Sequence, residues 1–288
     1  MTSSSDASQA RRVAVIGAGT MGTGIAQVCL ASGFEVVLHD ARREALDAAP
    51  ERIARGLARA AGGTPEPVPA RLHTSSTLVD AAAEADVVLE AIFEDAALKA
   101  RTWKELGAAA PAAALLGTNT SSLSVTELAR ASGRPERFIG LHFFNPVPVM
   151  PLVEVVRADT TPDPLVEEAV RFAGAIGKTP VVCADRPGFL VNRLLIPYLN
   201  EAAQLWDDGA ADATSIDRAM NLGANVPIGP LALADLIGID VVLSVMENLQ
   251  AEFGDPRYRP AQVLRRMVRA GRLGRKSGTG FHQYGGDE

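Results

Sequence analysis

The stretch Arg11-Arg12-Val13-Ala14-Val15-Ile16-Gly17-Ala18-Gly19-Thr20-Met21-Gly22-Thr23-Gly24-Ile25-Ala26 decides the fold of this 288-residue chain. It starts with a short apolar run rich in β-branched residues, which predicts a buried strand. Gly17, Gly19 and Gly22 follow with the spacing G-x-G-x-x-G, and apolar residues then recur at helical spacing. A helix that starts directly after such a turn presents unpaired N–H groups to phosphates. The stretch therefore predicts a dinucleotide site at these glycines, with Thr20 and Met21 at the helix start.

Each glycine has a separate physical reason in such a turn. Gly17 permits the tight turn, Gly19 lets a pyrophosphate approach the backbone, and Gly22 lets helix and strand pack closely. A second apolar strand, 35–39, ends at Asp40, where a carboxylate can accept hydrogen bonds from the ribose hydroxyls and repel a 2′-phosphate. This favours NAD over NADP. NADP stays an alternative, because arginines at positions 42 and 43 could bind the 2′-phosphate. A glycine turn without a ligand is the alternative interpretation.

Composition narrows the class of protein. Hydrophobic residues make up 47% of the chain, enough for a sizeable core, and the net charge of −6 argues against general nucleic-acid binding. Cys29 and Cys183 lie in apolar surroundings without metal-ligand spacing, which is typical of reduced cysteines in a cytoplasmic protein. No apolar run reaches membrane-spanning length. Residues 1–10 are polar and Ser-rich, and we expect a disordered leader there.

Strands and helices alternate up to about residue 185, which predicts an α/β fold with a mostly parallel, doubly wound Rossmann-like sheet. Beyond the sequence Asp185-Arg186-Pro187-Gly188 only helices are expected, so the predicted domains are 11–185 and 186–288. Gly62 to Pro69 is expected to be a loop. The expected strands are 13–16, 35–39, 86–90, 113–117, 138–143, 152–157 and 179–183. The expected helices are 41–61, 78–85, 95–109, 125–131 with Ser124 as its cap, 163–176, 189–208, 215–222, 231–238, 240–253 and 262–270.

A dehydrogenase acting on an alcohol needs a group that takes the hydroxyl proton, and histidine is the usual one. Among the four histidines, His142 ends an expected strand, where ligands gather in open α/β sheets. A return of the chain through Pro146 and Pro148 would bring Glu154 onto its imidazole, and such a carboxylate stabilises the imidazolium. A buried structural histidine and a surface glutamate are the alternative. The residues alone leave both interpretations open.

Several stretches resemble the L-3-hydroxyacyl-CoA dehydrogenase family, which includes bacterial 3-hydroxybutyryl-CoA dehydrogenases. The order and spacing of these stretches match over nearly the whole chain. They are 17–26, 90–95 (Glu-Ala-Ile-Phe-Glu-Asp), 119–123 (Asn-Thr-Ser-Ser-Leu), 142–150 (His-Phe-Phe-Asn-Pro-Val-Pro-Val-Met), 152–154 (Leu-Val-Glu), 187–193 (Pro-Gly-Phe-Leu-Val-Asn-Arg), 221–223 and 227–230.

The resemblance implies roles for individual residues. His142 is similar to the family's general base, and Glu154 to the carboxylate that orients it. Ser121 and Asn192 resemble residues that hold the substrate's 3-oxygen and the catalytic water or histidine. The implied cofactor contacts are Ser121 and Asn145 on the nicotinamide side, Glu94 and Lys99 at the NAD riboses, and Lys276 near the cofactor. No metal is implied.

The implied activity is the NAD-dependent interconversion of (S)-3-hydroxyacyl and 3-oxoacyl thioesters, with short-chain acyl-CoA such as 3-hydroxybutyryl-CoA as substrate. One segment departs from the family, because Gly56 and Gly63 stand where contacts to the CoA nucleotide are expected. An acyl-carrier-protein thioester, as in polyketide extender-unit synthesis, is therefore an alternative substrate, with Arg52, Arg55 and Arg59 facing an acidic partner. A non-catalytic NAD-binding protein is an alternative of another class, and a dehydrogenase with a lysine base is a third. Apolar helix faces at 194–205 suggest a homodimer.

Overall fold

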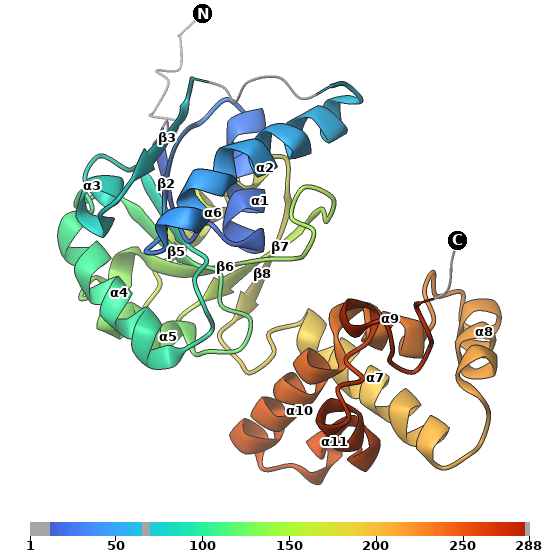
Figure 1. Cartoon of the computed structure of the whole chain (residues 1–288). Helices are drawn as coiled ribbons and strands as arrows, with labels where there is room; N and C mark the ends of the chain where they lie inside the picture. The colour runs from blue at the N-terminus through green and yellow to red at the C-terminus, as the bar shows by residue number, and fades with distance from the viewer. Residues whose placement is uncertain (1–11, 65–69, 286–288) are drawn as a thin grey trace, which may run out of the picture. The chain divides into compact units, whose positions relative to one another are not determined.

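The computed structural model describes residues 12–64 and 70–285. The expected leader at 1–10 and residues 65–69 of the expected loop lie outside these ranges. The chain divides into two compact units, Met1–Arg186 and Pro187–Glu288 (Figure 1).

Within the described part of the first unit, eight strands form one sheet in the order β3-β2-β1-β4-β5-β6-β7-β8. All neighbouring strands pair in parallel except β6 and β7, which are antiparallel. The predicted doubly wound, mostly parallel sheet is thereby confirmed. The strands are β1 (Arg12–Ile16), β2 (Glu35–His39), β3 (Leu72–Ser75), β4 (Val87–Glu90), β5 (Leu115–Thr118), β6 (Phe138–Phe143), β7 (Leu152–Arg157) and β8 (Thr179–Ala184).

Helices cover both faces of this sheet (Figure 1). One face carries α1 (Thr20–Ala31), α2 (Arg43–Ala61) and α6 (Asp163–Ala175), and the other carries α3 (Leu78–Ala82), α4 (Ala96–Ala109) and α5 (Val125–Ala131). Ser124 caps α5 as predicted, since its side chain accepts a hydrogen bond from the N–H of Glu127. Because both faces are covered, the central strands are apolar on both sides, as is typical of parallel sheets.

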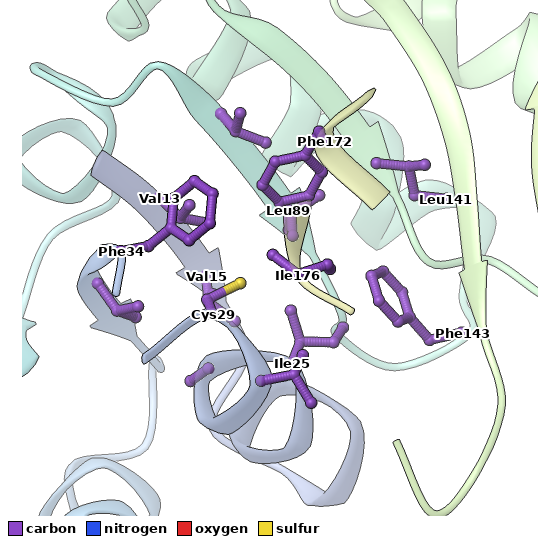
Figure 2. Close-up of a cluster of buried hydrophobic side chains, with 14 of the residues drawn as sticks. Val13, Val15, Ile25, Cys29, Phe34, Leu89, Leu141, Phe143, Phe172 and Ile176 are labelled. Atoms are coloured by element: carbon purple, nitrogen blue, oxygen red, sulfur yellow. The ribbon is translucent and has the colours of Figure 1, made fainter. Parts of the chain in front are cut away.

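The core beneath α1, α2 and α6 is fully buried and apolar (Figure 2). The rings of Phe34 and Phe172 meet edge to face at 5.8 Å between centroids, and Ile25 and Val15 lie in the same cluster. Figure 2 also shows Cys29 among these side chains. Burial raises the pKa of its thiol to about 12. This cysteine is therefore a protonated packing residue, and both cysteines are free.

The strand β3 was not expected from the sequence. Its four residues, Leu-His-Thr-Ser, contain a single apolar side chain, because an edge strand does not need two buried faces. It pairs only with β2, at the end of the sheet. The other expected strands and helices form, with their ends shifted by at most a few residues.

The second unit is helical in its described part, except for isolated bridges that join Gly274 to Thr279 and Thr279 to Gln283. Its helices are α7 (Val191–Asp207), α8 (Ala213–Gly223), α9 (Pro230–Ile237), α10 (Ile239–Phe253) and α11 (Gln262–Arg269). They enclose their own core, which includes Leu199, Leu231, Met246 and Leu264. Among residues 12–64 and 70–285, no helix combines the length and apolar character needed to cross a membrane.

Candidate active site

A cavity of about 390 Å³ opens at the carboxyl ends of β1, β2 and β4. Gly17 begins the turn at its floor with φ of +109°, a conformation that L side chains rarely adopt, and its N–H donates to the carbonyl of His39 at 2.7 Å. A Cβ on Gly22 would lie 1.7 Å from the carbonyl oxygen of Gly17, so only glycine permits this close packing. A Cβ on Gly19 would meet nothing within 4 Å, so its backbone faces open space.

The geometry of this turn fits a dinucleotide. Gly19 is the N-cap of α1 and provides no side-chain hydrogen bond, so the first helical turn, with Thr20 and Met21, presents its N–H groups without a side-chain acceptor. Asp40 follows β2 at the cavity wall, where one carboxylate oxygen accepts from the N–H of Ala18 at 2.8 Å. The remaining walls are mostly apolar, as an adenine ring requires.

The two arginines after Asp40 differ in position. Arg42 lines the cavity, and its guanidinium lies 5.8 Å from the centre of the Phe93 ring. Arg43 forms an ion pair with Asp47 along α2 and does not line the cavity.

His142 and Glu154 are brought together by the antiparallel pairing of β6 and β7. In this register the two residues are direct partners across the strands, and His142 Nδ1 lies 2.7 Å from Glu154 Oε2. Both side chains are buried, Glu154 completely. A buried carboxylate at this distance fixes the ring orientation and stabilises the imidazolium. This pair is therefore suited to proton transfer at the carboxyl end of β6.

The serine-rich loop after β5 is held by Glu94. One carboxylate oxygen, Oε1, accepts from the hydroxyl of Thr120 at 2.6 Å and from the N–H groups of Ser121 and Ser122 at 2.7 and 3.0 Å. The preceding residue, Asn119, accepts through its side-chain oxygen from the N–H of Phe143 at 2.8 Å. The loop is thereby tied to the residue next to His142. The role of Asn119 was not identified from the sequence.

Lys99 is completely buried beneath this loop. Its ammonium lies 2.5 Å from Glu90 Oε1 and 3.3 Å from Glu94 Oε2, and neither Lys99 nor Glu94 lines the dinucleotide cavity. Glu90 at the end of β4 is also fully buried and accepts from the indole N–H of Trp103. A lysine nine residues after a strand-ending glutamate was the only sign of this pair in the sequence.

A second cleft, of about 310 Å³, lies between α1, α2 and the loop after β6. Its lining includes Arg52, Arg55, Arg59 and the exposed Asn145. Arg52 donates to the backbone carbonyls of Ala18 and Ala45, both at 3.1 Å, so its guanidinium is already engaged. The cleft is thus basic on its helical side.

Two expected site residues belong to the second unit. Asn192 lies in the first turn of α7, and Lys276 forms an ion pair with both carboxylate oxygens of Asp240 at 2.6 and 2.7 Å. Throughout the part of the chain that the structure describes, no group of three histidine, cysteine or carboxylate side chains could hold a metal ion.

A glycine turn at a helix start, an acidic residue after the second strand and a buried histidine–carboxylate pair define the class of NAD-dependent dehydrogenases. Comparison with known proteins agrees. Residues 12–186 match the model of the 3-hydroxyacyl-CoA dehydrogenase NAD-binding domain, and residues 188–284 match that of the C-terminal domain. The chain therefore belongs to the 3-hydroxyacyl-CoA dehydrogenase family, which consists of NAD-dependent oxidoreductases.

Relatives cover nearly the whole chain. A probable 3-hydroxybutyryl-CoA dehydrogenase of Deinococcus radiodurans is 48% identical over 275 residues, which are 94% of this chain and 99% of that protein. A 3-hydroxybutyryl-CoA dehydrogenase of Clostridioides difficile is 43% identical, covering 95% and 99%. The crystal structure of (S)-3-hydroxybutyryl-CoA dehydrogenase PaaH1 from Ralstonia eutropha has a TM-score of 0.91 at 43% identity and covers 96% of this chain and all of that one (100%).

Proposed function

We propose that this protein interconverts (S)-3-hydroxyacyl-CoA and 3-oxoacyl-CoA thioesters of short chain length, with 3-hydroxybutyryl-CoA as a representative substrate. The observation that carries the proposal is the 2.7 Å contact between His142 and Glu154, next to the carboxyl edge of the sheet that forms the dinucleotide cavity. The names of the relatives from Deinococcus, Clostridioides and Ralstonia support this substrate class.

In the proposed mechanism His142 is the general acid–base group. With Nδ1–H donated to Glu154, Nε2 takes the proton of the substrate's 3-hydroxyl group during oxidation and returns it during reduction. Glu154 compensates the positive charge that the ring then carries. Bound NAD supplies the acceptor for the hydride that leaves C3.

Ser121 and Asn192 complete the proposed catalytic set by hydrogen bonding the 3-oxygen and the water or histidine next to it. Asn145 is proposed to contact the nicotinamide side and Lys276 to lie near the cofactor. Ser121 donates to Glu94 Oε1 from its N–H at 2.7 Å and from its hydroxyl at 3.2 Å. These bonds support its part in this set, because a fixed hydroxyl group loses less entropy when it binds substrate.

The test is NADH oxidation with acetoacetyl-CoA in His142→Gln and in the matched control His73→Gln. His73 lies on the edge strand β3, where its side chain is 52% exposed and 3.2 Å from Glu35 of β2. We expect His142→Gln to bind NADH normally and to lose roughly 10²- to 10⁴-fold in kcat, which is the usual contribution of a positioned acid–base group. Turnover of His142→Gln at the wild-type rate refutes the assignment.

A carrier-protein thioester is a second candidate substrate. The residues that line the cleft beside α2 support it. Gly56 brings no hydroxyl side chain to bind the CoA nucleotide, and a Cβ there would lie 2.1 Å from Gln27 Oε1, so a larger residue would have to displace the Gln27 amide. Only exposed arginines, such as Arg55 and Arg59, remain there as partners for phosphate.

The two substrates are distinguished by kcat/KM for one acyl group on CoA and on a carrier protein. If CoA is the substrate, the double variant Arg55→Ala/Arg59→Ala raises KM for the CoA thioester, while the control Arg171→Ala, 70% exposed on α6, leaves KM unchanged. A preference for the carrier-bound substrate contradicts the CoA proposal. A wild-type protein that binds NADH but turns over neither thioester supports the non-catalytic alternative.

We also propose that the protein is a cytoplasmic homodimer. The support is the exposure of apolar side chains on α7, where Leu194 is 76% and Leu205 is 47% exposed. Sedimentation velocity tests the dimer, because a monomer mass at all concentrations contradicts it.

A further inference from the structure

The last residues of β6 extend beyond the end of its neighbour β5. The parallel ladder between the two strands ends at the pair Thr118 and Gly140, whereas β6 continues through residues 141–143. His142 lies in this extension. Of the strands that the structure describes, only β7 pairs with these residues. A backbone N–H that points to the β5 side of the extension therefore needs an acceptor other than a strand.

Asn119 supplies this acceptor with its side chain. Its Oδ1 accepts from the N–H of Phe143 at 2.8 Å, and this N–H belongs to the peptide bond directly after His142. The backbone N–H of Asn119 donates to the carbonyl of Glu90 at 2.8 Å, so the residue is itself anchored at the end of β4. The side chain thus continues the hydrogen bonding of the sheet from β4 to the end of β6.

The held N–H lies at the point where the chain passes from one aromatic packing site to another. The ring of Phe143 is 3% exposed and belongs to the apolar core (Figure 2). The rings of its two neighbours, His142 and Phe144, contact each other with 4.5 Å between centroids. The backbone at residue 143 therefore sets the direction in which the imidazole leaves the strand.

The carboxylate of Glu154 alone does not determine where the imidazole points. Its contact at 2.7 Å holds one ring nitrogen, Nδ1. The position of Nε2 also depends on the backbone that carries the ring, because a ring held at a single atom can still pivot about that contact. Two constraints are needed, and the bond between Asn119 and the N–H of Phe143 provides the second.

We propose that Asn119 is a positioning residue for proton transfer, whose side-chain oxygen holds the backbone after His142 so that Nε2 points at the substrate's 3-hydroxyl group. This inference rests on the proposed acid–base role of His142. Asn119 exchanges no proton in this scheme. Its loss lowers turnover because a displacement of about 1 Å between reacting groups costs on the order of 10²-fold in rate.

The first experiment compares Asn119→Ala with the control Thr161→Val in NADH oxidation at saturating acetoacetyl-CoA. Thr161 also ties β6 through its side chain, but at the opposite end, where its buried hydroxyl donates to the carbonyl of Phe138 at 2.8 Å. We expect both variants to have a lower melting temperature, since each loses a hydrogen bond. Only Asn119→Ala should lose about 10- to 100-fold in kcat. A wild-type kcat for Asn119→Ala, or an equal fall in both variants, overturns the proposal.

The second experiment asks whether the effect passes through the histidine. Asn119→Ala is combined with His142→Gln, because residues that act through one another are not additive. If Asn119 positions the imidazole, its loss costs at most about twofold once the imidazole is absent. The same fold-loss in both backgrounds contradicts the proposal. In a parallel combination with Ser121→Ala the full loss should persist, and a loss that disappears only there would assign Asn119 to the serine-rich loop instead.

A second variant keeps the test open if Asn119→Ala does not fold. Asn119→Gln retains the amide but moves its oxygen by one methylene group away from the N–H of Phe143, and the same expectations apply to it. The two proposals can fail separately. Wild-type turnover of His142→Gln refutes the acid–base role, whereas loss of turnover in His142→Gln together with multiplicative losses in the double variant refutes only the role of Asn119.

Discussion

Replacement of Glu154 by glutamine tests the histidine–carboxylate pair most directly. Glutamine keeps the volume of a fully buried side chain but removes the charge at 2.7 Å from His142 Nδ1. A hydrogen bond to a charged group contributes about 1.5–3 kcal/mol. If this stabilisation is expressed in the transition state, kcat falls roughly 10- to 150-fold.

The assay is the steady-state oxidation of NADH with acetoacetyl-CoA, together with a separate NADH titration. We expect Glu154→Gln to keep its NADH dissociation constant, because Glu154 does not line the dinucleotide cavity. The control Glu167→Gln makes the same chemical change at a residue that is 73% exposed on α6 and leaves kcat unaffected. A folded Glu154→Gln enzyme with wild-type kcat would show that this carboxylate does not assist the proton transfer.

Three further predictions concern the dinucleotide turn and the buried charges. Gly22→Ala places a Cβ 1.7 Å from a backbone oxygen of the turn and raises the NADH dissociation constant at least about tenfold, whereas Gly174→Ala, with nothing within 4 Å, does not. Trp103→Phe removes the indole donor to Glu90 and lowers the free energy of unfolding in urea by about 2 kcal/mol. The lowered pKa of Glu94 makes its contribution to stability complete above its ordinary value of 4.5 and lost as pH falls below it. The difference in melting temperature between wild type and Glu94→Gln should therefore disappear in acid.

The fold was largely predictable because most elements carry their own local signal. An apolar run predicts the strand β1, and the glycine turn followed by apolar residues at helical spacing predicts the helix α1. The preference for serine at helix starts predicts that Ser124 caps α5. The edge strand β3 carries no such signal. It forms because the N–H and C=O groups of β2 need a partner on that side, which is a requirement of the sheet rather than of residues 72–75.

Contacts of the candidate site were predictable only where the two partners lie close together in the sequence. The turn through Pro146 and Pro148 suggested that Glu154 approaches His142, and the structure brings the two together. The burial of Lys99 could not be read from its helix, because its partners lie on β4 and in the segment after it. Asn119 was missed for the same reason, since its partner is the backbone of β6.

The antiparallel pairing of β6 and β7 has a consequence for how this family can vary. His142 and Glu154 are partners in the strand register, so their separation is set by the backbone ladder and not by the length of the connecting loop. Residues can be added to or lost from the segment 145–150 without parting the two side chains. A slip of the ladder by one position, in contrast, would turn the carboxylate to the opposite face of the sheet. A change in the length of this loop therefore leaves the histidine–carboxylate pair in place as long as the alignment of the two strands is kept.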